Sequence, residues 1–318
     1  MKNLKIILFA SAVLSFTSCS IGKTLCRIGM EPNYNKLVQN EEDRRFMERR
    51  YPGINAWYDN LRAEGILRDT TLISESGVPI HALYAGKEGS RDAVVLFHGY
   101  RVSCMAMMHF ARFYRDSLGF NVILADLQNH GKSGGKYVSF GWNDRRDALK
   151  WAKMAHNVWG SDFVVAHGVS MGAATIMMLS GEPDLPEYVR CFVEDCGFTT
   201  IQDELNYLAE RIKLSNKAME DIKQYCRKNL GWDPASASCL EQIAKCDRPM
   251  LFIHGNPDNF VPTRFVFKLY DAKIQGYKEL WISEGTKQHA VAYLTNTQEY
   301  EDHLRNFIAK ARDITSPR

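Results

Sequence analysis

The stretch that decides the fold is FVVAHGVSMG, residues 163–172 of a 318-residue chain. Phe163–Ala166 is an apolar run with β-branched residues, which is typical of a strand buried on both faces. A helical pattern begins at Met171, so the chain must turn sharply between the two elements. Ser170 stands in that turn, where the start of a helix favours developing negative charge. We therefore expect Ser170 to be a catalytic nucleophile.

Two glycines flank this serine at a spacing that the turn itself requires. Gly168 and Gly172 complete the pattern G-x-S-x-G, and a bulky neighbour two residues from the serine would clash in so tight a turn. A plainer alternative is that the small residues only allow the helix to pack closely on the strand. The strand–turn–helix setting favours the nucleophile over this alternative.

Similar apolar runs recur along the chain and predict the rest of the sheet. They occur at 93–97, 121–125, 191–193, 250–253 and 279–282. Strands that alternate with helical stretches indicate a parallel, doubly wound sheet. Two earlier runs, 70–75 and 78–85, predict strands joined at a Ser76–Gly77 turn. The expected fold class is α/β, with a core formed by residues 70–197 and 249–318.

Two segments depart from this alternation. Residues 198–248 show helical periodicity and no strand-like run. An insertion of this length is commonly a lid over a site, and the alternative is a helical decoration that covers the sheet edge. Residues 20–69 predict helices near 35–50 and 54–64, which we expect to form an N-terminal arm packed against the core.

The composition is that of a globular protein, with 45% apolar and 24% charged residues. It excludes a disordered, collagen-like or multi-spanning membrane chain. A chain of this length can bury most of its apolar surface without stabilisation by disulfides or metal ions. The 40 basic and 37 acidic side chains give a net charge of +3, so we expect no nucleic-acid partner. Composition leaves the oligomeric state open.

The first nineteen residues predict a targeting signal rather than part of the fold. Lys2 and Lys5 precede an apolar run, Ile6–Phe16, which ends at small residues and Cys19. The run is too short to span a bilayer as a helix. It resembles a bacterial lipoprotein signal, which implies lipidation of Cys19, a membrane anchor and a place in the cell envelope. Secretion after an ordinary cleaved signal is the alternative.

The cysteines predict neither a metal knuckle nor a redox motif. There are eight, seven of which remain if Cys19 is lipidated, and no C-x-x-C spacing occurs. We expect Cys191 and Cys196 to be buried apolar residues. Cys226, Cys239 and Cys246 lie near one another in the sequence, and one disulfide among them is an open alternative. We expect no metal and no organic cofactor.

Three further motifs accompany the serine turn in a familiar order. They are His98-Gly99-Tyr100 after the 93–97 run, DLQNHGKS at 126–133, and HGNPDNFVP at 254–262. With them, most of residues 70–312 resembles the α/β-hydrolase superfamily, and more narrowly the bacterial serine aminopeptidase-like hydrolases. The resemblance implies that the backbone N–H groups of Tyr100 and Met171 form the oxyanion hole. Gln128 stands where such relatives carry Arg, so any ion pair of that Arg is in doubt.

The base and the acid follow from the order of this fold, Ser, then acid, then His. Eight of the nine histidines fall on expected turns, strands or helices, which leaves His289 in the loop after the last strand. The resemblance of HGNPDNFVP to the family's H-G-x-x-D-x-x-V-P segment implies that Asp258 orients this histidine. Asp195, at the end of the preceding strand, is the alternative acid.

These residues predict acyl transfer through an acyl-enzyme. We expect an uncharged ester as substrate, and an amide or short peptide as the second choice, with lipids and thioesters also open. A different class is a non-catalytic binding protein on the same fold, since a fold alone does not prove activity. A structural envelope lipoprotein explains the N-terminus but not the triad.

Overall fold

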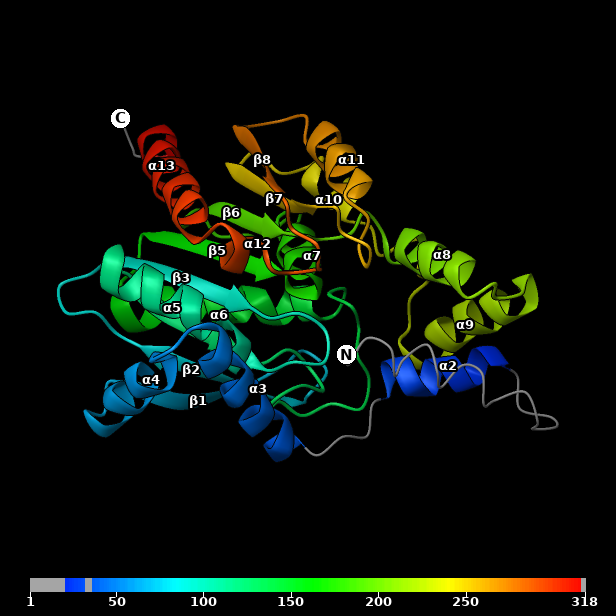
Figure 1. Cartoon of the computed structure of the whole chain (residues 1–318), viewed down its shortest axis with the longest axis horizontal. Helices are drawn as coiled ribbons and strands as arrows, with labels where there is room; N and C mark the ends of the chain where they lie inside the picture. Colours follow the sequence, from blue (N-terminus) through cyan, green and yellow to red (C-terminus); the bar gives the residue numbers. More distant parts are fainter. Residues whose placement is uncertain (1–20, 32–35, 316–318) are drawn as a thin grey trace.

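The computed structural model describes residues 21–31 and 36–315 (Figure 1). At its centre lies an eight-stranded sheet in the order β1-β2-β4-β3-β5-β6-β7-β8. The strands are β1 (Leu67–Ile73), β2 (Pro79–Ala85), β3 (Asp92–Phe97), β4 (Asn121–Ala125), β5 (Phe163–Val169), β6 (Val189–Asp195), β7 (Met250–Asn256) and β8 (Lys278–Glu284). The apolar runs of the sequence thus form β3 to β8, of which β8 is an edge strand.

Strands β3 to β8 pair in parallel, whereas β1 and β2 form an antiparallel hairpin that joins the sheet at β4. All five residues of β4 are buried, because helices cover both faces of a parallel sheet. The edge strand β1 is half exposed and carries Arg68 and Asp69, so it begins before the residue 70 expected from the sequence. The predicted α/β class with a doubly wound, mostly parallel sheet is confirmed.

The helices form a layer on each face of the sheet. One face carries α6 (Asp144–Trp159), α7 (Met171–Leu179), α10 (Cys239–Ile243) and α11 (Arg264–Ala272), whose apolar side chains share one core. The other face carries α3 (Lys36–Arg50), α4 (Ile54–Ala63), η1 (Cys104–Met107), α5 (Met108–Arg112), η2 (Phe113–Ser117), α12 (Ala292–Thr295) and α13 (Thr297–Thr315). Met105, Met108, Met177 and Met178 are buried in these two cores.

The segment predicted as a lid contains two different parts. Helices α8 (Ile201–Arg211) and α9 (Asn216–Asn229) lie to one side of the sheet (Figure 1). Each begins at a hydroxyl residue whose oxygen caps it, Thr200 for α8 and Ser215 for α9. An isolated antiparallel β-bridge between Thr200 and Ser238 joins the two ends of the segment that contains α8 and α9. Helix α10, by contrast, packs against α7 and α11 in the core layer.

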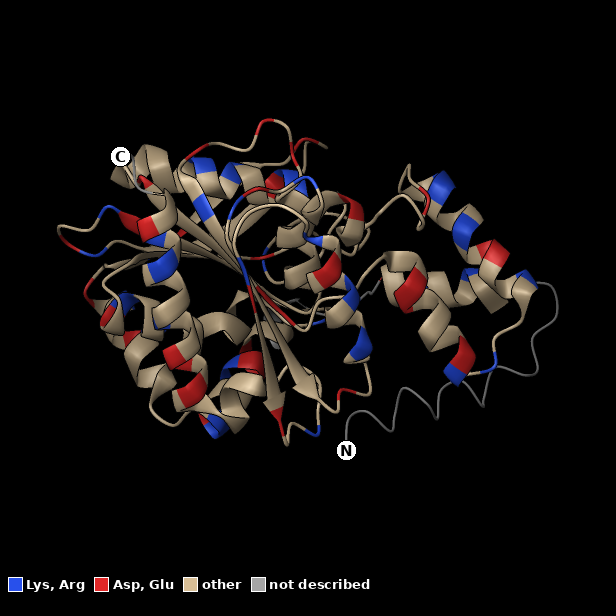
Figure 2. Ribbon diagram, turned by 90° about the horizontal axis from the view of Figure 1, so that it is seen from above, with Lys and Arg blue, Asp and Glu red and all other residues tan. Residues whose placement is uncertain are grey.

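The predicted N-terminal arm is likewise divided. Helices α3 and α4 pack on the core beside η1 and β1, whereas α2 (Ile21–Met30) lies against α9, far from them along the structure (Figure 1). Charges of both signs are mixed along the helices of the core and of the α8–α9 pair (Figure 2). Within the described ranges, no helix is long and apolar enough to cross a membrane.

Candidate active site

The turn between β5 and α7 has the strained geometry of a nucleophile elbow. Ser170 has φ 57° and ψ −115°, a conformation that a residue with a side chain rarely adopts. Its backbone N–H donates to the carbonyl of Asp195 on the neighbouring strand, at 2.8 Å. This bond and the start of α7 hold the strained residue in place, so the hydroxyl stands at the carboxyl end of the sheet.

Both glycines of the turn are sterically required. A Cβ on Gly168 would lie 2.1 Å from the carbonyl oxygen of Gly172, and a Cβ on Gly172 would lie 2.0 Å from that of Phe97. Both distances are far below van der Waals contact and both involve backbone, which cannot move aside. The absence of side chains at these positions therefore lets α7 begin directly beside β5 and β3.

The three residues predicted as a triad form one chain of hydrogen bonds. The Oγ of Ser170 lies 2.7 Å from Nε2 of His289, and Nδ1 of His289 lies 2.6 Å from Oδ2 of Asp258. With Nδ1 donating to the carboxylate, Nε2 is free to accept the serine proton. Such an arrangement can activate a hydroxyl as a nucleophile.

Asp258 is fixed by its own loop. Its Oδ1 accepts backbone bonds from Phe260 and Val261, at 2.8 and 3.1 Å, which leaves Oδ2 for His289. Burial alone would raise the pKa of this carboxyl, but the bond and the charge of His289, with the amide of Phe260, outweigh burial and lower its pKa below 3.8. The carboxyl is therefore an anion at neutral pH, as an orienting group must be.

Asp195, the alternative acid, lies elsewhere in the hydrogen-bond network. Its Oδ2 accepts from the hydroxyl of Tyr300 at 3.0 Å, and neither oxygen bonds to His289 among the described residues. Burial raises the pKa of Asp195 to about 6, so the carboxyl is more readily neutralised than that of Asp258. The geometry favours Asp258 as the partner of the histidine.

The loop that carries one predicted oxyanion donor, Tyr100, lies against Ser170, and the other donor, Met171, follows Ser170 in the chain. A Cβ on Gly99 would stand 3.4 Å from the Cβ of Ser170, which places the loop before Tyr100 directly against the nucleophile. Within the described ranges, the backbone N–H groups of Tyr100 and Met171 donate to no other residue. Two unpaired amides beside a nucleophile can bind the oxyanion of a tetrahedral intermediate.

Two histidines near the site belong to the frame, as the sequence predicted. The ring of His98 accepts from the amide of Leu127 at 3.1 Å. The ring of His254 donates to the carbonyl of Val261 at 3.0 Å. Burial lowers the pKa of both imidazoles, so neither is charged at neutral pH and neither competes with His289 as the base.

The turn at 126–133 is largely buried, and its side chains bond to the protein around it. The carboxylate of Asp126 accepts bonds from the His81 ring and from the amides of Cys104 and Lys132. Gln128, which stands where relatives carry Arg, donates its amide to Asp147 at 2.6 Å. Asp147 therefore has a neutral partner here, and burial, partly offset by this bond, raises the pKa of Asp147 to about 7.

The sequence did not point to Glu204, a buried carboxyl on α8. Both of its oxygens are buried and bond to no other described group. Burial, and then repulsion from Asp258, raise its pKa to about 8. Its neighbours Tyr207 and Arg211 donate to the carbonyl of Asn259, so α8 lies against the loop that holds Asp258. A Glu in an amphipathic helix gives no signal of such burial.

A second feature that sequence reasoning missed is the rim of the site. The ring of Phe260 lies 5.1 Å from that of His289 and is 41% exposed. An exposed aromatic ring beside the base offers an apolar surface to a substrate. Its position in HGNPDNFVP, two residues after the acid, is the signal that could have identified it.

Among the described residues, two groups of side chains have donor atoms close enough for a metal ion. They are His81, Cys104 and Asp126, and Cys196, Asp258 and His289. In the first group, Asp126 already accepts from the protein, and the second includes two members of the triad. These bonds account for both arrangements, and the expectation that no metal takes part stays a prediction.

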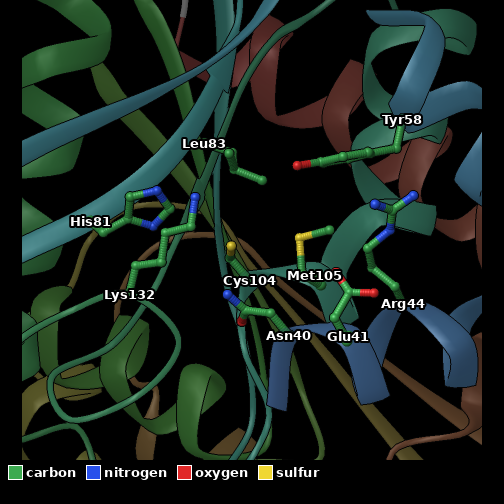
Figure 3. Close-up of a pocket in the computed structure, with 9 residues that line it drawn as sticks. All are labelled: Asn40, Glu41, Arg44, Tyr58, His81, Leu83, Cys104, Met105 and Lys132. Atoms are coloured by element: carbon green, nitrogen blue, oxygen red, sulfur yellow. The ribbon is translucent and has the colours of Figure 1, made fainter. Parts of the chain in front are cut away.

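A cavity of about 210 Å³ lies among α3, α4 and β2, and none of the triad residues lines it (Figure 3). Its two cations reach it from opposite sides and are both paired, Arg44 with Asp59 and Lys132 with Asp69. The acidic residue Glu41 also lines the cavity, so its charged groups are of both signs. The triad, rather than the cavity, marks the site.

The N-terminal prediction lies outside the described residues, which begin at Ile21. Lipidation of Cys19 thus stays a prediction. The seven described cysteines are all free and buried. The structure therefore contains no disulfide among Cys226, Cys239 and Cys246, and it buries Cys191 and Cys196 as expected.

A mostly parallel sheet with a serine elbow at one strand end defines a serine hydrolase of the α/β-hydrolase fold. A model of the prolyl oligopeptidase family matches residues 106–314, more than half of the chain. The chain belongs to this family. The narrower resemblance to serine aminopeptidase-like hydrolases stays a prediction.

Individual relatives are more distant. The chain is 27% identical to the uncharacterized protein YqkD of Bacillus subtilis (strain 168) over 245 residues, which cover 76% of this chain and 79% of YqkD. The Pyrococcus furiosus esterase Pf2001 has a similar fold, with a TM-score of 0.63 and 21% identity over 79% of this chain and 95% of the esterase. A puromycin-hydrolyzing peptidase of Mycobacterium tuberculosis also has a similar fold, with a TM-score of 0.59 and 18% identity over 77% of this chain and 39% of the peptidase.

Proposed function

We propose that the protein is a carboxylesterase-like hydrolase in which Ser170, His289 and Asp258 cleave an acyl ester. The observation that carries the proposal is the continuous hydrogen-bond chain from Ser170 through His289 to Asp258, with bonds of 2.7 and 2.6 Å. His289 takes the proton of Ser170 as the hydroxyl attacks the acyl carbonyl, and Asp258 stabilises the resulting imidazolium.

The oxyanion of the tetrahedral intermediate lies between the amides of Tyr100 and Met171. Each donor of this kind contributes on the order of 3 kcal/mol to transition-state binding. His289 then protonates the leaving group, and water attacks the acyl-enzyme by the same route in reverse. The exposed ring of Phe260 beside His289 supports an apolar group in the substrate, which is why an uncharged ester is the first choice.

An amide with a free amino group is the second candidate, and Glu204 favours it. A carboxyl with a pKa near 8 and no bonded partner is neutral when the site is empty. An ammonium group placed beside it would draw it into its charged form. An aminopeptidase-like substrate carries such a group, whereas a simple ester does not.

One screen separates these candidates. We would compare p-nitrophenyl esters of two to twelve carbons with aminoacyl p-nitroanilides and their N-acetylated forms. Ester hydrolysis that is insensitive to Glu204→Gln supports the first candidate. Hydrolysis of aminoacyl amides that falls on N-acetylation, and falls likewise in Glu204→Gln, supports the second. Ser170→Ala must abolish either activity, and a variant with unchanged turnover would contradict both.

The cellular address belongs to the proposal as well. We propose that the mature protein is anchored to a membrane of the cell envelope through a lipid on Cys19, with secretion as the alternative. The charged start, the short apolar run and Cys19 support this address.

A further inference from the structure

Helix α2 lies between two parts of the molecule that are far apart in the sequence. On one side it packs on helix α9, and at its carboxyl end it contacts the loop His98–Arg101, here called the oxyanion loop. None of the motifs found in the sequence falls within α2. Its position beside two parts of the site is therefore the feature to explain.

The contact between α2 and α9 is unusually close. A Cβ on Gly22 would lie 2.4 Å from the carbonyl oxygen of Ala218 and 2.6 Å from the Cβ of Asp221. Further along, the sulfur atoms of Met30 and Cys226 are 3.8 Å apart. Gly22 and Met30 are eight residues apart, as are Ala218 and Cys226. The two helices thus run side by side in the same direction, and Gly22 sets their separation.

The carboxyl end of α2 is capped by the oxyanion loop. The hydroxyl of Tyr100 donates to the carbonyl of Gly29 at 2.6 Å, and the guanidinium of Arg101 donates to that of Ile28 at 2.8 Å. The last carbonyls of a helix lack partners within it, and a cation there also complements the helix dipole. The same bonds fix Tyr100 and Arg101 in space.

The oxyanion loop needs such support. Arg101 has φ 61°, a left-handed conformation that costs free energy for a residue with a side chain. Its backbone N–H donates to the ring of His130 at 3.2 Å, and the Tyr100 ring packs against Phe140. A strained loop persists only where its surroundings hold it, and α2 supplies two of those contacts.

We propose that α2 is a positioning element that sets the Tyr100 amide against Ser170 according to how α2 packs on helix α9. Tyr100 and Arg101 act as positioning residues through their side chains, and Gly22 fixes this packing. The inference rests on the proposed function, in which that amide binds the oxyanion. A misplacement well below 1 Å suffices, because transition-state stabilisation depends steeply on donor geometry.

The test compares two substitutions at opposite ends of α2 in the full-length protein. Tyr100→Phe removes the bond to Gly29 and keeps the backbone amide, whereas Gly22→Ala forces α2 away from α9. Each should lower kcat per active site roughly tenfold and change KM by less than about twofold. Arg27→Ala, an exposed position on the same helix, and Tyr277→Phe, a tyrosine just before β8, are the matched controls and should behave as wild type.

The double variant makes the test specific. Gly22 and Gly29 lie about 10 Å apart along the helix, a separation at which independent effects add. If both changes act by displacing α2, the kcat of the double variant should be little lower than that of the more impaired single variant. Independent effects would instead multiply to a loss in kcat of roughly a hundredfold. Additive losses, or wild-type kcat in Tyr100→Phe, would overturn the inference.

A fluorophosphonate probe distinguishes this failure from failure of the proposed function. Active sites are counted by one-to-one labelling of Ser170 in a separate aliquot of each preparation that is used for kinetics. A wild-type protein that is not labelled at Ser170 contradicts the proposed function itself. Full labelling with unchanged kcat in Tyr100→Phe leaves the proposed function intact and rejects the role of α2.

Discussion

The Oγ of Ser170 and the Nε2 of His289 lie 2.7 Å apart although 119 residues separate them in the chain. Ser170 follows β5, and His289 stands in the loop after β8, three strands away in the sheet. Because parallel strands end at the same edge, the order of the sheet brings these loops together. The contact is therefore a property of the whole core.

The first prediction concerns the acid. Asp258→Asn should lower kcat by about 10⁴, because an amide at this place can fix the wrong tautomer of His289. Asp195→Asn is the matched control: Tyr300 keeps its acceptor, and kcat should stay within about tenfold. Steady-state kinetics on the best ester from the screen gives the answer. The reverse order of losses would make Asp195 the acid.

The second prediction concerns the elbow. Gly172→Ala places a Cβ 2.0 Å from a β3 carbonyl oxygen, so the variant should fold poorly and lose several kcal/mol of stability, on the order of 3 or more. Gly29→Ala is the control, since its Cβ would meet nothing closer than 4.0 Å. Soluble yield and thermal unfolding check this. Equal melting temperatures for the two variants would show that the elbow is not so tightly packed.

The third prediction concerns pH and Glu204, whose pKa rises from 4.5 to about 8 on folding. Because the folded state holds this proton more tightly, wild-type stability is lost as the pH rises from about 4.5 to about 8. Glu204→Gln lacks this titration. The melting temperature of Glu204→Gln minus that of the wild type should therefore increase between pH 5 and pH 8, by on the order of 5 °C. This difference should level off above pH 8.

Glu210→Gln serves as the control for that experiment, because Glu210 is exposed on the same helix. Its difference from wild type should not vary with pH. A Glu204→Gln difference that is constant from pH 5 to pH 9 would mean that the carboxyl is not buried as described.

The fourth prediction concerns the N-terminus. Mass spectrometry of the mature protein should find Cys19 as the first residue, with a mass increase that corresponds to lipid. Cys19→Ala should move the protein from the membrane fraction to the soluble fraction or leave it unprocessed. A mature protein that begins elsewhere and carries no lipid would favour simple secretion.

Local patterns predicted the parts of the fold that are encoded locally. The elbow was recognisable because strand, glycine spacing and helix all occur within ten residues, and the inner strands because burial on both faces demands continuous apolar runs. Edge strand β1 was placed too late, since its exposed Arg68 and Asp69 resemble a loop. The order of the motifs nominated His289, and the resemblance of HGNPDNFVP to the family segment implied Asp258 rather than Asp195. The structure brings His289 and Asp258 together.

Contacts between distant segments could not be predicted in this way. The packing of α2 on α9 depends on the contact between Gly22 and Ala218. Neither residue type indicates in the sequence which segment it will contact. Glu204 is another such case, because its burial depends on how α8 lies over the loop of Asp258. Both features arise from tertiary packing, which a single sequence does not display.

The rate at which a fluorophosphonate labels Ser170 tests the central claim most directly. Intact-mass measurements should show one adduct per wild-type chain, mapped to Ser170, and none on Ser170→Ala. His289→Ala should label slower by a factor on the order of 10³ or more, because the hydroxyl then has no base. A wild-type chain that takes up no probe, or a His289→Ala variant that is labelled as fast as wild type, would contradict the account.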